Sequence, residues 1–246
     1  MIRTTPFHER TSVLNETGLW SHWSGHLAAD RYQMSDKFEY FAVRNSAGIF
    51  DTSPLYKYRI AGLDAERFLG GMLARDVRAC PVGHAQYTTW LDDRGFVLED
   101  GVIQHRAPDE YLLTSAEPNF GYFADRIGRL KVAIEDVSSQ IGTIAVQGPR
   151  SRELLAPLVP SVATTPYFGL TSGRIGGAPW VPVDRSDADG DVIVRVNSAT
   201  NLVDRVLSPG AGFSGGGDIV VAEGSVWVVD GLNNQVLRLP LSAFVE

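Results

Sequence analysis

The chain has 246 residues, of which 44% are hydrophobic and 21% charged, and its formal net charge is −7. This composition is that of an ordinary globular protein and excludes a disordered or fibrous chain. The negative charge argues against a non-specific nucleic-acid binder, and the single cysteine, Cys80, excludes an internal disulfide and a multi-cysteine metal site.

The N-terminal sequence, MIRTTPFHER, carries charges where a secretory signal would be apolar. No later apolar run is long enough to span a bilayer. We therefore expect a cytoplasmic protein with no membrane partner and no nucleic-acid partner.

The first 136 residues predict an alternation of strands and helices. Residues 1–50 are rich in aromatic side chains and predict a short helix followed by a strand. Residues 56–60, YKYRI, alternate as a strand does, and Gly62 and Asp64 then offer a turn and an N-cap before a helix over 65–77. Further along the chain we expect strands at 86–93, 94–106, 109–116 and 131–136, and a second helix at 119–130.

This order of elements predicts an α+β module over residues 50–140, with two helices on one face of a mostly antiparallel sheet. A strand, a turn and a helix follow at 143–159. From residue 181 to 246 the sequence changes to short β-rich runs divided by Gly and Asn turns. This pattern predicts an antiparallel meander within 190–240, with Asp191, Asn197, Asn201 and the run Gly215–Gly217 at turns. Its exposed strand edges would favour a homo-oligomer.

Four segments carry a resemblance to a known family. They are FHERTSVLNETGLW at 7–20, AVRNSAGIFDTSPLYKYRIAG at 42–62, AQYTTWLDDRGFVLEDGVI at 85–103 and AVQGPRSRELL at 145–155. In this order and spacing they resemble the glycine-cleavage T-protein family, which includes aminomethyltransferases and folate-dependent demethylases. The resemblance covers residues 1–180 and implies a T-protein-like folate-binding N-terminal half.

Residues 181–246 do not continue that pattern. The family's Thr-Gly-Tyr-Thr-Gly-Glu stretch is absent, and the β-rich C-terminal segment resembles blade segments of NHL or virginiamycin-lyase-type β-propellers. About one and a half blades cannot close a propeller ring. The chain therefore reads as a chimera of two kinds of sequence.

The resemblance to the T-protein family implies a set of site residues. Asp100 matches the carboxylate that assists one-carbon transfer, and Tyr87 and Val102 match positions that line the folate pocket. Thr114 and Ser115 stand where the family usually has Asn for hydrogen bonding to the pterin. From the residues alone, Asp100 could equally be a turn residue before Gly101, and Tyr87 a strand aromatic that faces the core.

Other residues have a functional and a structural interpretation side by side. Asp51 is expected to cap the turn that follows it. His22 and His26 have the i, i+4 spacing of a helical metal pair, but no third ligand is evident, so packing or surface roles are favoured. Arg150 and Arg152 could receive an anionic glutamate tail, although arginines that open a helix are more often solvated.

The resemblance implies a tetrahydrofolate-dependent transferase that moves a methyl or aminomethyl unit from a small-molecule one-carbon donor. Its cofactor would be tetrahydrofolate, and no metal is expected. Because one stretch of the folate site is missing, we expect weakened folate binding and transfer. The alternative function is a non-catalytic binding or scaffold module that combines a partial T-protein with propeller-like strands.

Overall fold

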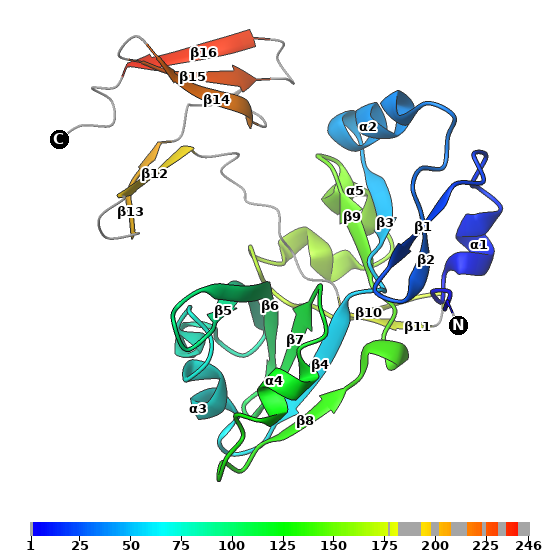
Figure 1. The fold of residues 1–246 in the computed structure, drawn as a ribbon. Helices are drawn as coiled ribbons and strands as arrows, with labels where there is room; N and C mark the ends of the chain where they lie inside the picture. Colours follow the sequence, from blue (N-terminus) through cyan, green and yellow to red (C-terminus); the bar gives the residue numbers. More distant parts are fainter. Residues whose placement is uncertain are drawn as a thin grey trace. The chain divides into compact units, whose positions relative to one another are not determined.

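The computed structural model describes residues 2–176 and 178–181, together with the backbone of five strands between residues 193 and 240. The chain divides into two compact units, residues 1–185 and 186–246 (Figure 1). The first unit contains the four segments that resemble the T-protein family, so the description concentrates on it.

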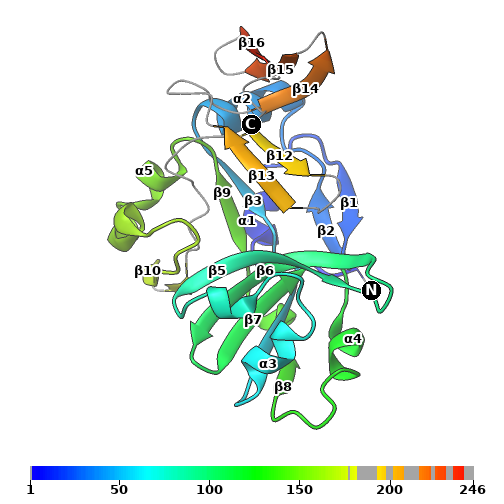
Figure 2. The ribbon, with the colours of Figure 1, turned by 90° about the vertical axis from the view of Figure 1, so that its left-hand side faces the viewer.

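A five-stranded antiparallel sheet forms the centre of the first unit, as the sequence predicted for the α+β module. Its order is β5-β6-β7-β4-β8, and Figure 2 labels the strands β5, β6 and β7 of this sheet. The strand that closes the module, β8, therefore pairs with the first one, β4 (Figure 1). The bounds are β4 Tyr56–Ala61, β5 His84–Leu91, β6 Val97–Ala107, β7 Glu110–Ser115 and β8 Ala133–Asp136.

One face of this sheet is covered by two short helices, α3 (Ala65–Gly70) and α4 (Phe120–Ala124). Alternation along the strands turns Tyr58 and Leu113 towards the helices, where both are fully buried. Phe123 of α4 meets Tyr58 edge to face, with the ring centroids 5.2 Å apart. We call this side of the sheet the helix-covered face, and the opposite side the second face.

Both helices are shorter than the sequence predicted. The helix expected over 65–77 ends at Gly70, where two glycines in succession weaken helical propensity, and residues 77–79 form a separate 3₁₀ turn. The helix expected over 119–130 ends at Ala124, and Gly128 then adopts a positive φ of 56°. Asp64 stands at the N-cap of α3, but its carboxylate accepts from the backbone N–H of Lys131 instead of capping the helix.

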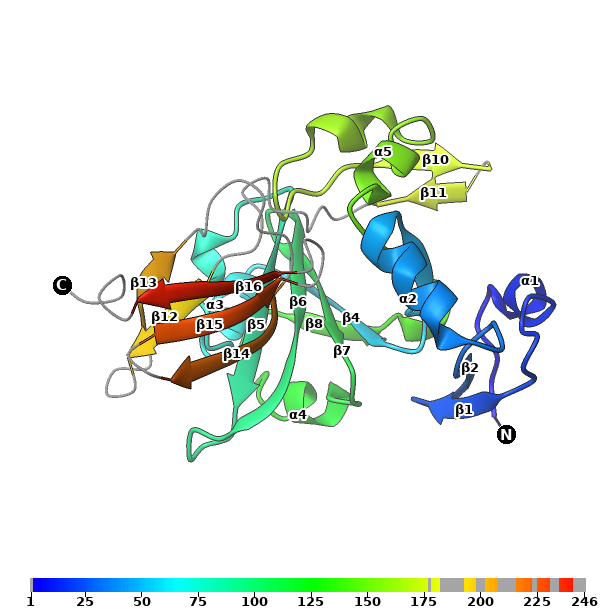
Figure 3. The ribbon, with the colours of Figure 1, turned by 90° about the horizontal axis from the view of Figure 1, so that it is seen from above.

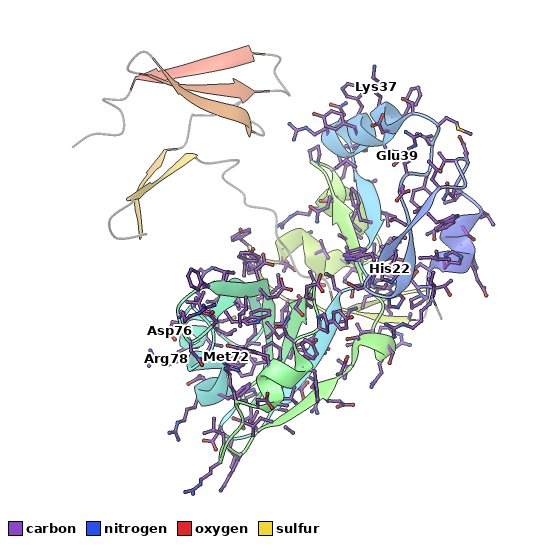
Figure 4. All side chains as sticks on the ribbon, in the orientation of Figure 1. His22, Lys37, Glu39, Met72, Asp76 and Arg78 are labelled. Atoms are coloured by element: carbon purple, nitrogen blue, oxygen red, sulfur yellow. The ribbon has the colours of Figure 1, made fainter. Side chains whose placement is uncertain are left out.

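The N-terminal residues form a layer beside the central sheet (Figure 3). Helix α1 (His8–Ser12) precedes a hairpin of β1 (Trp20–Trp23) and β2 (His26–Ala29), and α2 (Asp36–Asn45) leads into β3 (Gly48–Asp51). The hairpin replaces the helical geometry that the spacing of His22 and His26 suggested. Figure 4 shows His22 on this hairpin. A metal pair on one helical face is therefore excluded for these two histidines.

Strand β3 pairs with β9 (Ile144–Gln147), which brings together two of the four family-like segments from far apart in the chain. Gly148 follows β9 with a φ of 128°, and a Cβ there would collide with the carbonyl oxygens of Val43 and Ser46. The remaining elements of the first unit are η1 Val77–Ala79, η2 Ser138–Gln140, α5 Ser151–Leu155, η3 Pro160–Thr164, β10 Gly173–Ile175 and β11 Ala178–Trp180.

The second unit contains two small antiparallel sheets. Strands β12 (Ile193–Asn197) and β13 (Leu202–Leu207) form one, and β14 (Gly216–Ala222), β15 (Ser225–Asp230) and β16 (Gln235–Pro240) form a three-stranded meander. Gly216 and Gly217 belong to β14 and not to the turn predicted for them, while Asp191, Asn201 and Gly215 lie outside the described residues.

None of the helices among the described residues is long and apolar enough to cross a membrane.

Substitution of Gly101 on β6 tests whether β6 and β7 must approach each other closely. Gly101 lies on the helix-covered face above Trp90, and a Cβ at this position would overlap the carbonyl oxygen of Thr114 on β7. Gly101→Ala should therefore lower the free energy of unfolding by about 1–3 kcal/mol through forced displacement of the strand pair. Denaturant unfolding measures this loss.

Gly121→Ala is the matched control. This glycine lies in α4 with no atom within 4 Å of an added Cβ, so alanine should leave stability unchanged or raise it by up to about 1 kcal/mol. Equal stability of the two variants would show that the β6–β7 approach does not constrain the sheet.

Candidate functional site

Strand register brings most of the predicted site residues onto the second face. Tyr87 of β5 lies opposite Val102 of β6, and Val102 lies opposite Thr114 of β7. Residues directly opposite each other point to the same side of a sheet, so these three form a row across three neighbouring strands. The row faces away from the helices and the hydrophobic core.

Asp100 joins this row through Tyr87. It precedes Val102 by two residues on β6 and so shares its face, and the Tyr87 hydroxyl donates a hydrogen bond to the Asp100 carboxylate. Asp100 lies inside the continuous strand β6, so the alternative of a turn residue is wrong. The alternative of a core aromatic is wrong for Tyr87, whose exposed fraction is 42%.

The neighbouring carboxylate, Glu99, is committed to structure. It points to the opposite side from Asp100, where its two oxygens accept from the backbone N–H groups of Asp100 and Glu117, each at 2.9 Å. These bonds tie β6 to the chain that follows β7. Of the two adjacent acids, Asp100 is therefore the one presented on the second face.

Thr114 and Ser115 are separated by the same alternation. Thr114 lies on the second face, and its hydroxyl is 3.3 Å from both the backbone nitrogen and the carbonyl oxygen of Val102. Ser115 is buried on the helix-covered face and donates to the carbonyl oxygen of Glu117 at 2.7 Å. The structure thus brings Asp100, Tyr87, Val102 and Thr114 together, and leaves Ser115 on the other side of the sheet.

Sequence analysis missed one member of this row, Lys57. It lies on β4 directly opposite Thr114, which extends the row to a fourth strand, yet only 1% of the residue is exposed. Its ammonium donates to the carbonyl oxygens of Ser53 at 2.9 Å and Leu55 at 2.8 Å. The alternation of YKYRI places Lys57 away from the core, but a polar residue on that side is ordinarily expected to be solvated.

Burial sets the protonation behaviour of Lys57. Desolvation lowers its pKa from 10.5 to about 8, against the opposing effect of the carboxylates of Asp51 and Asp136. No carboxylate of the described residues forms an ion pair with it within 4.0 Å. The ammonium is therefore stabilised mainly by backbone carbonyls, which is an energetically costly way to bury a charge.

The other predicted residues have structural roles. Asp51 accepts from the backbone N–H of Ser53 at 3.0 Å, which confirms the expected turn cap. Arg150 forms a bidentate pair with Glu153 at 2.8 and 2.6 Å on the surface. Arg152 donates to the carbonyl oxygens of Val162 and Ala163. Both guanidinium groups are thus engaged within the fold.

A cavity of about 400 Å³ lies away from this row, between the N-terminal hairpin and the β3–β9 pair. Trp20, Trp23 and Phe50 line it together with Asp51. The Asp51 carboxylate also accepts from the Thr5 hydroxyl, so both of its oxygens already have partners. The surface of this cavity is mainly apolar, although Thr5, His8 and Gln147 also line it, and Thr52 and Pro54 of the turn before β4 form part of its wall.

The described part of the chain contains neither a cluster of metal ligands nor an activated thiol. No three His, Cys, Asp or Glu side chains there are grouped so as to hold a metal ion. Cys80 is buried, and desolvation raises the pKa of its thiol, which disfavours the nucleophilic thiolate. Within the row of Tyr87, Val102 and Thr114, Asp100 contributes the carboxylate.

Comparison with known proteins identifies the family. The profile of the GCVT N-terminal domain matches residues 8–212. The chain belongs to the glycine-cleavage T-protein family. This match extends past residue 180, although the motifs that resemble the family lie within residues 1–180.

Curated T-protein relatives are similar over much of this chain. The aminomethyltransferase of Saccharopolyspora erythraea is 33% identical over 181 residues, which are 72% of this chain and 48% of the relative. That of Parafrankia sp. is 33% identical over 227 residues, covering 87% of this chain and 60% of the relative. The chain thus spans about half the length of the curated relatives it matches.

A solved T-protein has the same fold. The crystal structure of glycine cleavage system aminomethyltransferase T from Bartonella henselae matches with a TM-score of 0.64 and 20% sequence identity. The match covers 71% of this chain and 48% of that one. Together with the antiparallel sheet and its two helices, it confirms the T-protein-like α+β fold.

The lowered pKa of Lys57 predicts a distinctive stability profile. Between pH 8 and 10.5 the unfolded chain binds more protons at this lysine than the folded chain does, so the wild type gains stability as pH rises. Below pH 8 Lys57 is protonated in both states, so the free-energy cost of burying its charge destabilises the folded chain in full. In Lys57→Met this contribution is absent, so the stability of the variant relative to wild type should fall by up to about 1.4 kcal/mol per pH unit across the window.

Denaturant unfolding of both proteins at pH 7, 9 and 10 measures this difference. Comparison with the variant cancels the pH dependence that the other ionisable groups contribute to both proteins. A difference that stays constant from pH 7 to 10 would show that the Lys57 ammonium carries no desolvation penalty.

Proposed function

We propose that this chain binds tetrahydrofolate on the second face of its central sheet and contributes the Asp100 carboxylate to an aminomethyl transfer. The observation that carries the proposal is the hydrogen-bonded pair of Tyr87 and Asp100, held on adjacent strands beside Val102 and Thr114. The one-carbon donor is then a small molecule that carries an amine.

The residues of the second face suit a planar, polar heterocycle. The Tyr87 ring is partly exposed and can stack on a pterin, while Val102 offers an apolar surface next to it. Thr114 supplies a hydroxyl at the following strand, but that hydroxyl already contacts the backbone of Val102. Thr114 stands where the family usually has Asn, whose amide offers a donor and an acceptor side by side. A single hydroxyl should therefore hold the pterin less tightly.

Asp100 can act on the donor in two ways. Its carboxylate is partly exposed and forms no ion pair with any described Lys or Arg, so its negative charge is available to a cationic amine. It can also accept a proton from that amine, while the Tyr87 hydroxyl fixes the orientation of the carboxylate. Tetrahydrofolate, when bound, supplies the nitrogen that accepts the one-carbon unit.

Support for aminomethyl transfer over methyl transfer comes from the relatives. The curated relatives from Saccharopolyspora erythraea and Parafrankia sp. are named aminomethyltransferases, and so is the solved structure from Bartonella henselae. Because this chain spans about half of their length, their complete activity is carried over only as a proposal.

Titration with tetrahydrofolate, followed by protein fluorescence, tests the binding claim, since five tryptophans give signal. Asp100→Asn should weaken binding by roughly ten- to a hundredfold, because a charged hydrogen-bond partner contributes about 1.5–3 kcal/mol. Tyr87→Phe should weaken it less, since the ring remains and only the hydroxyl that orients Asp100 is lost.

Asp109→Asn serves as the control, because this exposed acid lies at the turn between β6 and β7, at the far end of β6 from Asp100. It should bind as the wild type does. If Asp100→Asn and Asp109→Asn bound tetrahydrofolate equally well, Asp100 would have no role in the site.

A further inference from the structure

Lys57 is a buried charge that the catalytic proposal leaves without a role. It occupies the β4 position of the row that contains Tyr87, Val102 and Thr114, and it is 1% exposed. No described carboxylate pairs with it. An apolar side chain of similar length would fill this position without desolvating an ammonium, so packing alone does not explain the lysine.

The hydrogen bonds of Lys57 show what it holds in place. Both acceptors of its ammonium, the carbonyl oxygens of Ser53 and Leu55, belong to the turn over residues 52–55 that joins β3 to β4. The turn has its own internal bond, from the N–H of Leu55 to the carbonyl oxygen of Thr52. Lys57 thus ties this turn back to the strand that follows it.

The same turn is tied to the N-terminal layer from its other side. The backbone N–H of Thr52 donates to the carbonyl oxygen of Thr143 at 3.0 Å, and the N–H of Ser53 donates to Asp51. The turn is therefore the junction between the β3–β9 pair and the central sheet. The two hydrogen bonds from Lys57 add a tie from this junction to β4.

We propose that Lys57 is a positioning residue, whose ammonium holds the 52–55 turn at the end of the second face opposite Tyr87 and so shapes that end of the folate site. This role rests on the proposed binding of tetrahydrofolate to that face. Lys57 acts through the turn and does not itself touch the ligand.

The charge on Lys57 makes this contact sensitive to pH. Its pKa of about 8 means that the ammonium is largely lost by pH 9, and burial is the main cause of this lowered value. The charged groups that act on it are Asp51 of β3 and Asp136 of β8, which oppose the effect of burial. Because opening the turn would return Lys57 to solvent and to its ordinary pKa of 10.5, deprotonation should favour the closed turn.

The test combines hydrogen exchange with ligand titration on wild type, Lys57→Met and Lys131→Met. Lys131 is exposed and makes no ion pair within the described residues, so it is the matched control. Protection factors of the Ser53 and Leu55 amides report the turn directly. At pH 7, Lys57→Met should lower these by about tenfold and weaken tetrahydrofolate binding by about tenfold, which corresponds to the loss of one hydrogen bond of ordinary strength.

The pH profile distinguishes a positioning role from a general loss of structure. Wild type and Lys131→Met should gain turn protection between pH 7 and 9, because loss of the proton removes the cost of burying the charge, whereas Lys57→Met should show no such change. Unaltered protection of Ser53 and Leu55 in Lys57→Met would overturn the proposal. Loss of turn protection with unchanged folate affinity would also overturn it, because the turn would then not shape the site.

Failure of the proposed function gives a different result. If neither wild type nor the two variants bound tetrahydrofolate, the proposed folate site would be refuted. The claim that Lys57 shapes that site would be refuted with it. The exchange data would still decide whether Lys57 holds the turn.

Discussion

Alternation along β6 is the constraint on which the site depends. Glu99, Gly101 and Ile103 face the helices, whereas Asp100 and Val102 face the other way. Gly101 permits β6 and β7 to approach because it has no Cβ to meet the Thr114 carbonyl. This close approach fixes the register that aligns Tyr87, Val102 and Thr114. Alternation places Glu99 where it accepts backbone hydrogen bonds and Asp100 on the second face, where we propose that it acts.

The two faces of the sheet differ in the side chains that they carry. Nearly all of the large buried apolar side chains gather on the helix-covered face around Tyr58, Trp90 and Phe123. The second face instead carries a partly exposed carboxylate, an exposed tyrosine and a buried lysine without an ion-pair partner among the described residues. Such groups do little for stability, and buried ionisable groups of this kind concentrate at functional sites. The site is thus built on a rigid support formed by the other face.

Local patterns were predictable from the sequence, and long-range contacts were not. Period-two alternation gave the strands β4 to β8 with small errors, because it depends only on neighbouring residues. The pairing of β3 with β9 and the position of β8 beside β4 join segments distant in sequence, and no local signal specifies them.

Thr114 and Ser115 were both assigned to the site, but register sends Ser115 to the other face. Lys57 was missed because its burial depends on the 52–55 turn folding over it.

The central claim is that the second face binds tetrahydrofolate, and nuclear magnetic resonance tests it most directly. Backbone amide shifts of the labelled protein would be followed as tetrahydrofolate is added. The account predicts saturable shifts centred on Tyr87, Asp100, Val102 and Thr114, which extend to the turn over residues 52–55. Shifts confined instead to the cavity around Trp20, Trp23 and Phe50, or none at millimolar ligand, would contradict it.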